Sequence, residues 1–301
     1  MAIKPYLQLV RLPNLFTAAA DSLAGWILAT GSLQEPRRWV PLVLASVAIY
    51  AGGIVLNDVF DHDIDLRERP GRPLPSGRVS RRFAAWFGVF ALAMGPCLTA
   101  LSGSWSSLVV AAILAACVLG YDAGLKRTIL GPEIMGACRG LNLLLGLSQD
   151  GDFGGPYAWM IALGLAVFVA GVTWISRSEV ESGKTRGIAA GLVLEKSAVV
   201  GLVVASVGMS LTSGVGESRV SATTFGLVIW CAVAAVIYLA GRRALRTPIP
   251  EVIQKAVKTG VLALVWLDVA AVATVRGPAA ALAVAALWVP AFLLGRWLYS
   301  T

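Results

Sequence analysis

Ten apolar segments, each close to the length that crosses a lipid bilayer, recur along this chain of 301 residues. An α-helix rises about 1.5 Å per residue, so about 20 apolar residues span the roughly 30 Å hydrocarbon core of a membrane. Inside lipid the backbone polar groups of such a segment must bond to one another, which a helix of this length achieves. We therefore predict membrane-spanning helices near residues 12–30, 39–57, 83–101, 104–121, 132–148, 157–176, 188–213, 222–240, 256–275 and 279–298.

The overall composition agrees with a membrane protein. Apolar residues make up 57% of the chain and charged residues 14%, whereas soluble proteins average roughly 45–50% and about 25%. No linker, low-complexity tail or coiled coil divides the sequence. The expected fold class is all-α, a polytopic membrane helical bundle that forms a single domain over residues 1–301.

The basic residues gather in alternate loops and predict the orientation in the membrane. Fifteen of the 25 lysines and arginines lie in the loops 67–82, 122–131, 176–187 and 241–255. Loops rich in Lys and Arg face the cytoplasm, so we expect an integral multi-pass protein, in a bacterial inner membrane, with these loops inside. The net charge of +8 then reflects topology and contact with lipid headgroups, and we expect no nucleic-acid partner.

An acidic stretch, NDVFDHDID, follows the second apolar segment directly. On a continuing helix Asp58, Asp61 and Asp65 would share one face, with Asn57 at its edge and Asp63 pointing away. Three carboxylates on one face repel one another unless a cation neutralises them. Mg²⁺ binds oxygen ligands of this kind together with substrate phosphates. The alternative is a solvated helix end that merely stops the membrane segment.

Arginines follow the acidic stretch within a loop that is rich in proline and glycine. Arg67, Arg69, Arg72 and Arg78 are interleaved with prolines in the run RERPGRPLPSGR. Guanidinium groups beside a metal-binding carboxylate cluster suit a polyanion such as diphosphate. The chain has a single histidine, His62, which excludes a metal centre built on several histidines.

These motifs resemble those of the UbiA superfamily of intramembrane prenyltransferases. NDVFDHDID with RPLPSGRVS is similar to the family's first aspartate motif, N-D-x-x-D-x-x-x-D, and YDAGLK to its Y-x-x-x-x-K element. GPEIMGACRGLNLLLG resembles the family's fifth helix, and KPYLQLVRLPNLFTAAADSLAGW with SRSEVESG is most similar to the EboC-like branch. The resemblance covers about residues 5–190.

The resemblance implies a fold and a set of site residues. The family fold is a helical bundle, usually of nine spans, around a central cavity open to lipid, so nine or ten spans are expected here. By the same resemblance Mg²⁺ and a prenyl diphosphate are bound by Asn57, Asp58, Asp61 and Asp65. Tyr121 and Lys126 would help to bind the diphosphate.

The family's second aspartate motif, D-x-x-D-x-x-x-D, is largely missing. Alignment on Gly183 places Val172, Ile175 and Glu179 at its three acidic positions. Only Glu179 is acidic, so we expect fewer metal ions, with Arg177 or Lys184 supplying positive charge in their place. An arginine can replace part of a metal's electrostatic role, although not its Lewis acidity.

Four further side chains are candidates because of where they lie in the apolar segments. Arg139 and Asn142, three residues apart, either face a headgroup or diphosphate or belong to an Arg–Asp pair that ties helices together. Trp174 could line the cavity and stabilise a carbocation through its aromatic face. Asp21 lies near the middle of the first span and could serve the cavity or have a structural role.

The predicted function is Mg²⁺-dependent ionisation of an allylic prenyl diphosphate, followed by transfer of the prenyl group to an unidentified small-molecule acceptor. Three alternatives stay open. A terpene cyclase would share the ionisation and capture the cation intramolecularly. A prenyl-diphosphate or lipid-binding protein without catalysis would explain the missing second motif. An ion-coupled transporter could use Asp21, Arg139 and Asp268, although the acidic loop motif argues against it.

Overall fold

The computed structural model describes residues 3–178, 185–212 and 217–299. Within these ranges the chain forms α-helices, short 3₁₀ helices and turns, with no strand. The helices are α1 (Lys4–Leu9), α2 (Leu12–Thr30), α3 (Pro36–Phe60), α4 (His62–Glu68), α5 (Arg81–Ala100), α6 (Trp105–Ala123), η1 (Leu125–Arg127), α7 (Gly131–Leu147), η2 (Ser148–Asp150), α8 (Gly155–Arg177), α9 (Thr185–Thr212), α10 (Glu217–Arg246), α11 (Pro250–Arg276), α12 (Pro278–Ala285) and α13 (Trp288–Tyr299). The predicted all-α membrane bundle is confirmed.

Every predicted apolar segment contains helix, although the last one does not form a single helix. Segment 279–298 is divided between α12 and α13, with a turn at Ala286 and Leu287. Pro290 explains the break, because it has no N–H to donate to the carbonyl of Ala286 and its ring clashes with that carbonyl. The tenth segment is therefore present but broken.

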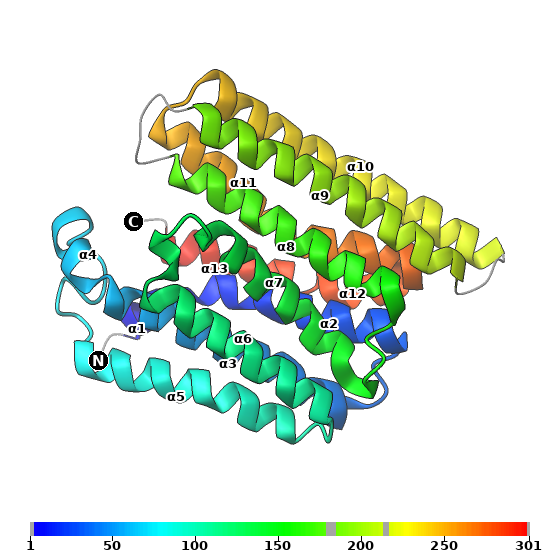
Figure 1. Cartoon of the computed structure of the whole chain (residues 1–301), viewed down its shortest axis with the longest axis horizontal. Helices are drawn as coiled ribbons and strands as arrows, with labels where there is room; N and C mark the ends of the chain where they lie inside the picture. Colours follow the sequence, from blue (N-terminus) through cyan, green and yellow to red (C-terminus); the bar gives the residue numbers. More distant parts are fainter. Residues whose placement is uncertain (1–2, 179–184, 213–216, 300–301) are drawn as a thin grey trace.

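Eight segments of the described chain are long and apolar enough to cross a membrane, and neither α2 nor α7 is among them. These two helices lie between the others (Figure 1), with α9 and α10 on one side of the bundle and α5 on the other. Helices that contact protein rather than lipid can carry polar residues at membrane depth. Helix α7 is also short, with 17 residues, and the central position of the two helices accommodates their buried polar residues, among them Asp21 and Arg139.

Helices α2 and α7 pack with their backbones in contact. A Cβ atom added at Gly25 would lie 2.2 Å from the carbonyl oxygen of Leu143, and one added at Gly146 would lie 2.0 Å from that of Ser22. Only glycine permits such an approach, as in other tightly packed membrane helices.

A buried ion pair also joins these two helices. Asp21 on α2 is fully buried, and its Oδ2 lies 2.6 Å from Nε of Arg139 on α7. Asn142 donates a hydrogen bond from Nδ2 to the same oxygen at 2.9 Å, and Arg139 donates from Nη2 to the carbonyl of Thr17 at 2.9 Å. Of the two readings of Arg139, the Arg–Asp pair that ties helices together is present.

Candidate functional site

The acidic stretch lies where α3 ends and α4 begins, and the predicted continuous helix is interrupted there. Asp61 is the junction residue, with φ −91° and ψ 6°, and its N–H still donates to the carbonyl of Asn57 at 2.9 Å. With this interruption, Asp58 and Asp65 face one group of cationic side chains and Asp61 faces another. The side chain of Asp63 is 82% exposed and lies near Arg81 at 3.8 Å, away from both groups as expected.

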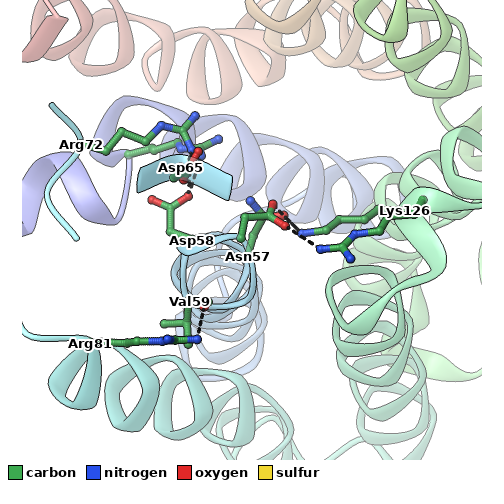
Figure 2. A network of polar contacts seen from close by, with 10 residues as sticks. Asn57, Asp58, Val59, Asp65, Arg72, Arg81 and Lys126 are labelled. Atoms are coloured by element: carbon green, nitrogen blue, oxygen red, sulfur yellow. Dashed lines mark hydrogen bonds and ion pairs between the residues drawn. The ribbon is translucent and has the colours of Figure 1, made fainter. Parts of the chain in front are cut away.

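The first group of contacts joins Asp58 and Asp65 to two arginines. Nη1 of Arg72 lies 2.6 Å from Oδ2 of Asp65 and 3.6 Å from Oδ1 of Asp58. Nη2 of Arg11 lies 3.0 Å from Oδ1 of Asp58. Figure 2 shows Asp58 and Asp65 close to Arg72, on the other side of α3 from Arg81. Both carboxylates are buried, so their charges depend on these partners.

The second group joins Asn57 and Asp61 to Lys126, which reaches them from η1. Nζ of Lys126 donates to Oδ1 of Asn57 at 2.9 Å and to Oδ2 of Asp61 at 2.6 Å, as Figure 2 shows for Asn57. Nη2 of Arg127 lies 3.5 Å from Oδ1 of Asp61. The structure thus brings together Asn57, Asp61 and Lys126, residues from two motifs that are far apart in the sequence.

The donor set suits a hard divalent cation. Among the described residues no three acidic, histidine or cysteine side chains converge on one point. Two cationic nitrogens nevertheless each stand between a pair of oxygen donors: Nη1 of Arg72 between Asp58 and Asp65, and Nζ of Lys126 between Asn57 and Asp61. Each nitrogen marks a place where oxygen atoms already surround a positive charge, and oxygen is the ligand type that Mg²⁺ prefers.

A hollow of about 420 Å³ opens beside the first group. Arg11, Asp58 and three arginines of the following loop contribute to its lining; the loop residues are Arg69, Arg72 and Arg78. Arg67 does not line it and is exposed on α4, where no ion pair is found for it within the described chain. Four guanidinium groups around one hollow are suited to a multiply charged anion.

Two cavities lie deeper between the helices, with volumes of about 330 Å³ and 260 Å³. Both are lined by Arg11, Tyr50 and Tyr121 together with apolar side chains, so they adjoin one another. We call these two hollows together the central cavity. The larger is also lined by Arg139 and Asn142.

Arg11 is a site residue that the sequence reasoning missed. It lines the arginine-rich hollow and both parts of the central cavity. It lies between α1 and α2 with φ 46° and ψ 53°, a left-handed conformation that side chains other than glycine and asparagine rarely adopt. The available signal was an arginine followed by Leu12-Pro13 at the start of the first span. Its contact with Asp58, 47 positions later, could not be read from the sequence.

Arg177 and Trp174 lie at the end of α8 and contact none of the carboxylates of the acidic stretch: Arg177 bonds to the turn before α7, and Trp174 bonds to the first turn of α7. Nη2 of Arg177 donates to the carbonyl of Lys126 at 2.6 Å and to that of Thr128 at 2.7 Å. Nε1 of Trp174 donates to Glu133 at 3.1 Å, and Trp174 lines neither part of the central cavity. Arg177 therefore holds the turn that carries Lys126.

The positions of the second aspartate motif are apolar where the structure describes them. Val172 lines the central cavity and Ile175 is buried. Glu179, the acidic residue of that motif, and Lys184 lie outside the described residues. The described part of this motif offers no oxygen ligand.

The sequence is similar to known proteins that form one family. Residues 19–183 match the UbiA prenyltransferase family. The digeranylgeranylglyceryl phosphate synthase of Metallosphaera sedula is 33% identical over 154 residues, which cover 50% of this chain and 54% of that protein. The enzyme of the same name from Methanoculleus marisnigri is 30% identical over 181 residues, 58% of this chain and 60% of that protein. The chain thus spans about half the length of the curated relatives it matches.

Two solved structures share the fold. One, from a study of digeranylgeranylglyceryl phosphate synthase in membranes, has a TM-score of 0.63 at 21% identity and covers 91% of this chain and 98% of that one. A UbiA homologue from Aeropyrum pernix K1 has a TM-score of 0.62 at 17% identity and covers 85% of this chain and 96% of that one. Since the family match covers more than half of the 301 residues, this integral membrane protein belongs to the UbiA prenyltransferase family.

Proposed function

We propose that this protein is a Mg²⁺-dependent intramembrane prenyltransferase that ionises an allylic prenyl diphosphate and transfers the prenyl group to an acceptor. One observation carries the proposal. An arginine-lined hollow with paired carboxylates adjoins a largely apolar cavity, and Arg11 lines both. A prenyl diphosphate has the same two parts, a polyanionic head and an apolar chain.

The head would bind where the cations now neutralise the carboxylates. Asn57, Asp58, Asp61 and Asp65 would hold Mg²⁺, which neutralises charge on the diphosphate as it leaves. Arg72 and Lys126, released from the carboxylates by the metal, would turn to the diphosphate oxygens. Lys126 stands at the apolar side of the cluster, with 11% of its side chain exposed, so its charge is weakly screened there.

The apolar chain and the allylic carbon would lie in the central cavity. Tyr50 and Tyr121 line it, and the guanidinium of Arg139 lies over the ring of Tyr50 at 5.9 Å. Tyr121 would therefore be the aromatic side chain that stabilises a developing carbocation. The two arginines that line this cavity within the described chain are both paired, Arg139 with Asp21 and Arg11 with Asp58, which weakens their repulsion of the cation. Exclusion of water from the cavity protects the cation from hydrolysis.

A phosphate-bearing lipid alcohol is the acceptor that we favour. The relatives are named for digeranylgeranylglyceryl phosphate, a lipid of that type. A further hollow of about 450 Å³ between α2, α11 and α13 carries Lys258 and Arg296 and shares Asn14 and Val261 with the central cavity. Cations beside an apolar path into the cavity suit an anionic lipid that enters from the membrane.

The site would face the cytoplasm, because the basic loops lie at its end of the bundle. The relatives come from archaea, so the bacterial inner membrane expected from the sequence stays a prediction. Soluble prenyl diphosphates would reach the arginine-rich hollow from that side.

The test is a product assay on the purified protein. It would be incubated with geranyl, farnesyl or geranylgeranyl diphosphate and Mg²⁺, with and without geranylgeranylglyceryl phosphate or a membrane extract. We expect a prenylated product that depends on the acceptor. A hydrocarbon product formed without acceptor would favour a cyclase. Absence of any product, together with unchanged ligand binding by Asp61→Ala, would refute the enzymatic reading in favour of a binding protein.

A further inference from the structure

A fourth carboxylate, that of Asp122, lies near the acidic stretch, and no described side chain forms an ion pair with it. Asp122 lies at the end of α6, with 4% of its surface exposed. Its Oδ2 has no hydrogen-bond partner, and no ion pair to Asp122 is found within the described ranges. Buried carboxylates are normally paired or hydrogen-bonded because an isolated buried charge is costly. Asp122 therefore calls for a partner that is absent from the protein itself.

The unpartnered oxygen lies beside the central cavity. Asp122 lines the smaller part of it, together with Asn57, Tyr121 and Arg11. Oδ2 lies 3.8 Å from the place where a Cβ atom at Gly53 would stand, so it faces α3 one turn before Asn57. Val118 packs against Gly53, so the open space at this carboxylate is the cavity itself, which Gly53, Val118 and Asp122 line. The carboxylate is thus positioned to receive a group that enters the cavity.

The other carboxylates of the site are already engaged. Asp58, Asp61 and Asp65 each lie within 3.0 Å of an arginine or lysine nitrogen, and they are the proposed metal ligands. Of the acidic residues in the described chain, only Asp122 lines either part of the central cavity. It is therefore the one candidate there for a proton acceptor supplied by an acidic side chain.

Transfer of a prenyl group to a hydroxyl group requires a base that takes up the hydroxyl proton. The bond between the allylic carbon and the diphosphate oxygen breaks, and its electron pair leaves with the diphosphate. A new bond forms between the allylic carbon and the acceptor's oxygen, whose O–H proton must then leave. We propose that Asp122 is the catalytic base of this reaction: its Oδ2 accepts a hydrogen bond from the acceptor hydroxyl and then takes the proton. This role rests on the proposed transferase function and adds a residue to it.

The matched substitutions are Asp122→Asn, which keeps the size and removes the charge, Asp122→Glu, which restores the carboxylate, and Asp152→Asn as an exposed control. Three quantities would be measured for each: affinity for a non-hydrolysable geranylgeranyl diphosphate analogue with Mg²⁺, release of diphosphate without acceptor, and transfer to geranylgeranylglyceryl phosphate. Thermal unfolding in detergent verifies that each variant is folded.

We expect Asp122→Asn to bind the analogue with an affinity within about threefold of that of the unmodified protein, and to release diphosphate without acceptor at a rate within about threefold. Transfer of the prenyl group to the acceptor should be about 100-fold slower or more, the usual range for loss of a general base. Asp122→Glu should recover at least about tenfold of that loss. Transfer by Asp122→Asn at the unmodified rate would overturn the proposal and leave the diphosphate itself as the base. Loss of analogue binding by both variants would also overturn it, by assigning Asp122 to the diphosphate site. Absence of transfer by the unmodified protein would instead refute the proposed function.

Discussion

Asp61 and Asp63 are two residues apart in the same short stretch, yet their side chains lie in different surroundings. The side chain of Asp61 is 21% exposed and lies 2.6 Å from Lys126, whereas that of Asp63 is 82% exposed and faces Arg81 at 3.8 Å. We predict that Asp61→Ala impairs catalysis and that Asp63→Ala does not. Both substitutions remove one negative charge and a side chain of the same size, so their difference reports position alone.

The magnitude follows from the charge that is lost. A unit charge about 4 Å from a cation is worth about 4 kcal/mol at an effective dielectric constant near 20. Partial exposure and competing cations reduce this, so we take about 2.7 kcal/mol as the minimum loss, which is about 100-fold in kcat/KM. For Asp63, an exposed surface carboxylate, we expect a change within about threefold.

The assay is diphosphate release from geranylgeranyl diphosphate at several Mg²⁺ concentrations. The Asp61 variant should require more Mg²⁺ as well as turning over more slowly, because a metal ligand and a partner of Lys126 are both lost. Equal losses at the two positions would refute the division of the stretch into inward-facing and outward-facing carboxylates. So would an Asp61 variant whose rate and Mg²⁺ requirement are unchanged.

The packing and the anion site give further predictions. Arg139→Met leaves the buried Asp21 without its cationic partner and should lower the free energy of unfolding by about 3–5 kcal/mol, which is measured as a lower melting temperature in detergent. Adding Asp21→Asn to this variant should restore part of the melting temperature. Gly146→Ala places a Cβ atom 2.0 Å from a backbone oxygen and should lower the free energy of unfolding by about 1–3 kcal/mol. Gly201→Ala, with nothing within 4 Å of its Cβ atom, should leave the free energy of unfolding unchanged or raise it by about 0.4–1 kcal/mol. Equal effects of the two substitutions would contradict the close packing of α2 and α7. Arg11→Gly relieves a left-handed backbone while removing a guanidinium and should weaken binding of a non-hydrolysable prenyl diphosphate analogue about tenfold or more; unchanged affinity would exclude Arg11 from the anion site.

Most of the fold could be predicted from the sequence because hydropathy is a local property. The segments 12–30 and 132–148 were found this way although α2 and α7 are not the most apolar helices. The break between α12 and α13 could not be found from hydropathy, because it depends on Pro290, which removes one backbone hydrogen bond within a continuous apolar run.

The part of the site whose residues lie close together in the sequence could be predicted. Asp58, Asp61 and Asp65 stand out in one stretch, but their division between Arg72 and Lys126 depends on the interruption at Asp61 and on contacts from distant helices. Asp122 was visible as the second residue of YDAGLK, yet nothing in the sequence indicates that its carboxylate is buried and unpartnered. Such a property arises only when α6 packs against α3.

The central claim is that metal-assisted ionisation of an allylic diphosphate takes place at the acidic stretch. The most direct measurement compares the release of diphosphate from geranylgeranyl diphosphate with that from its fully saturated counterpart, each with Mg²⁺ and with EDTA. A saturated chain binds in the same way but cannot form an allylic cation. We predict Mg²⁺-dependent release of diphosphate from the allylic compound alone. Equal release from both compounds, or release that persists in EDTA, would contradict it.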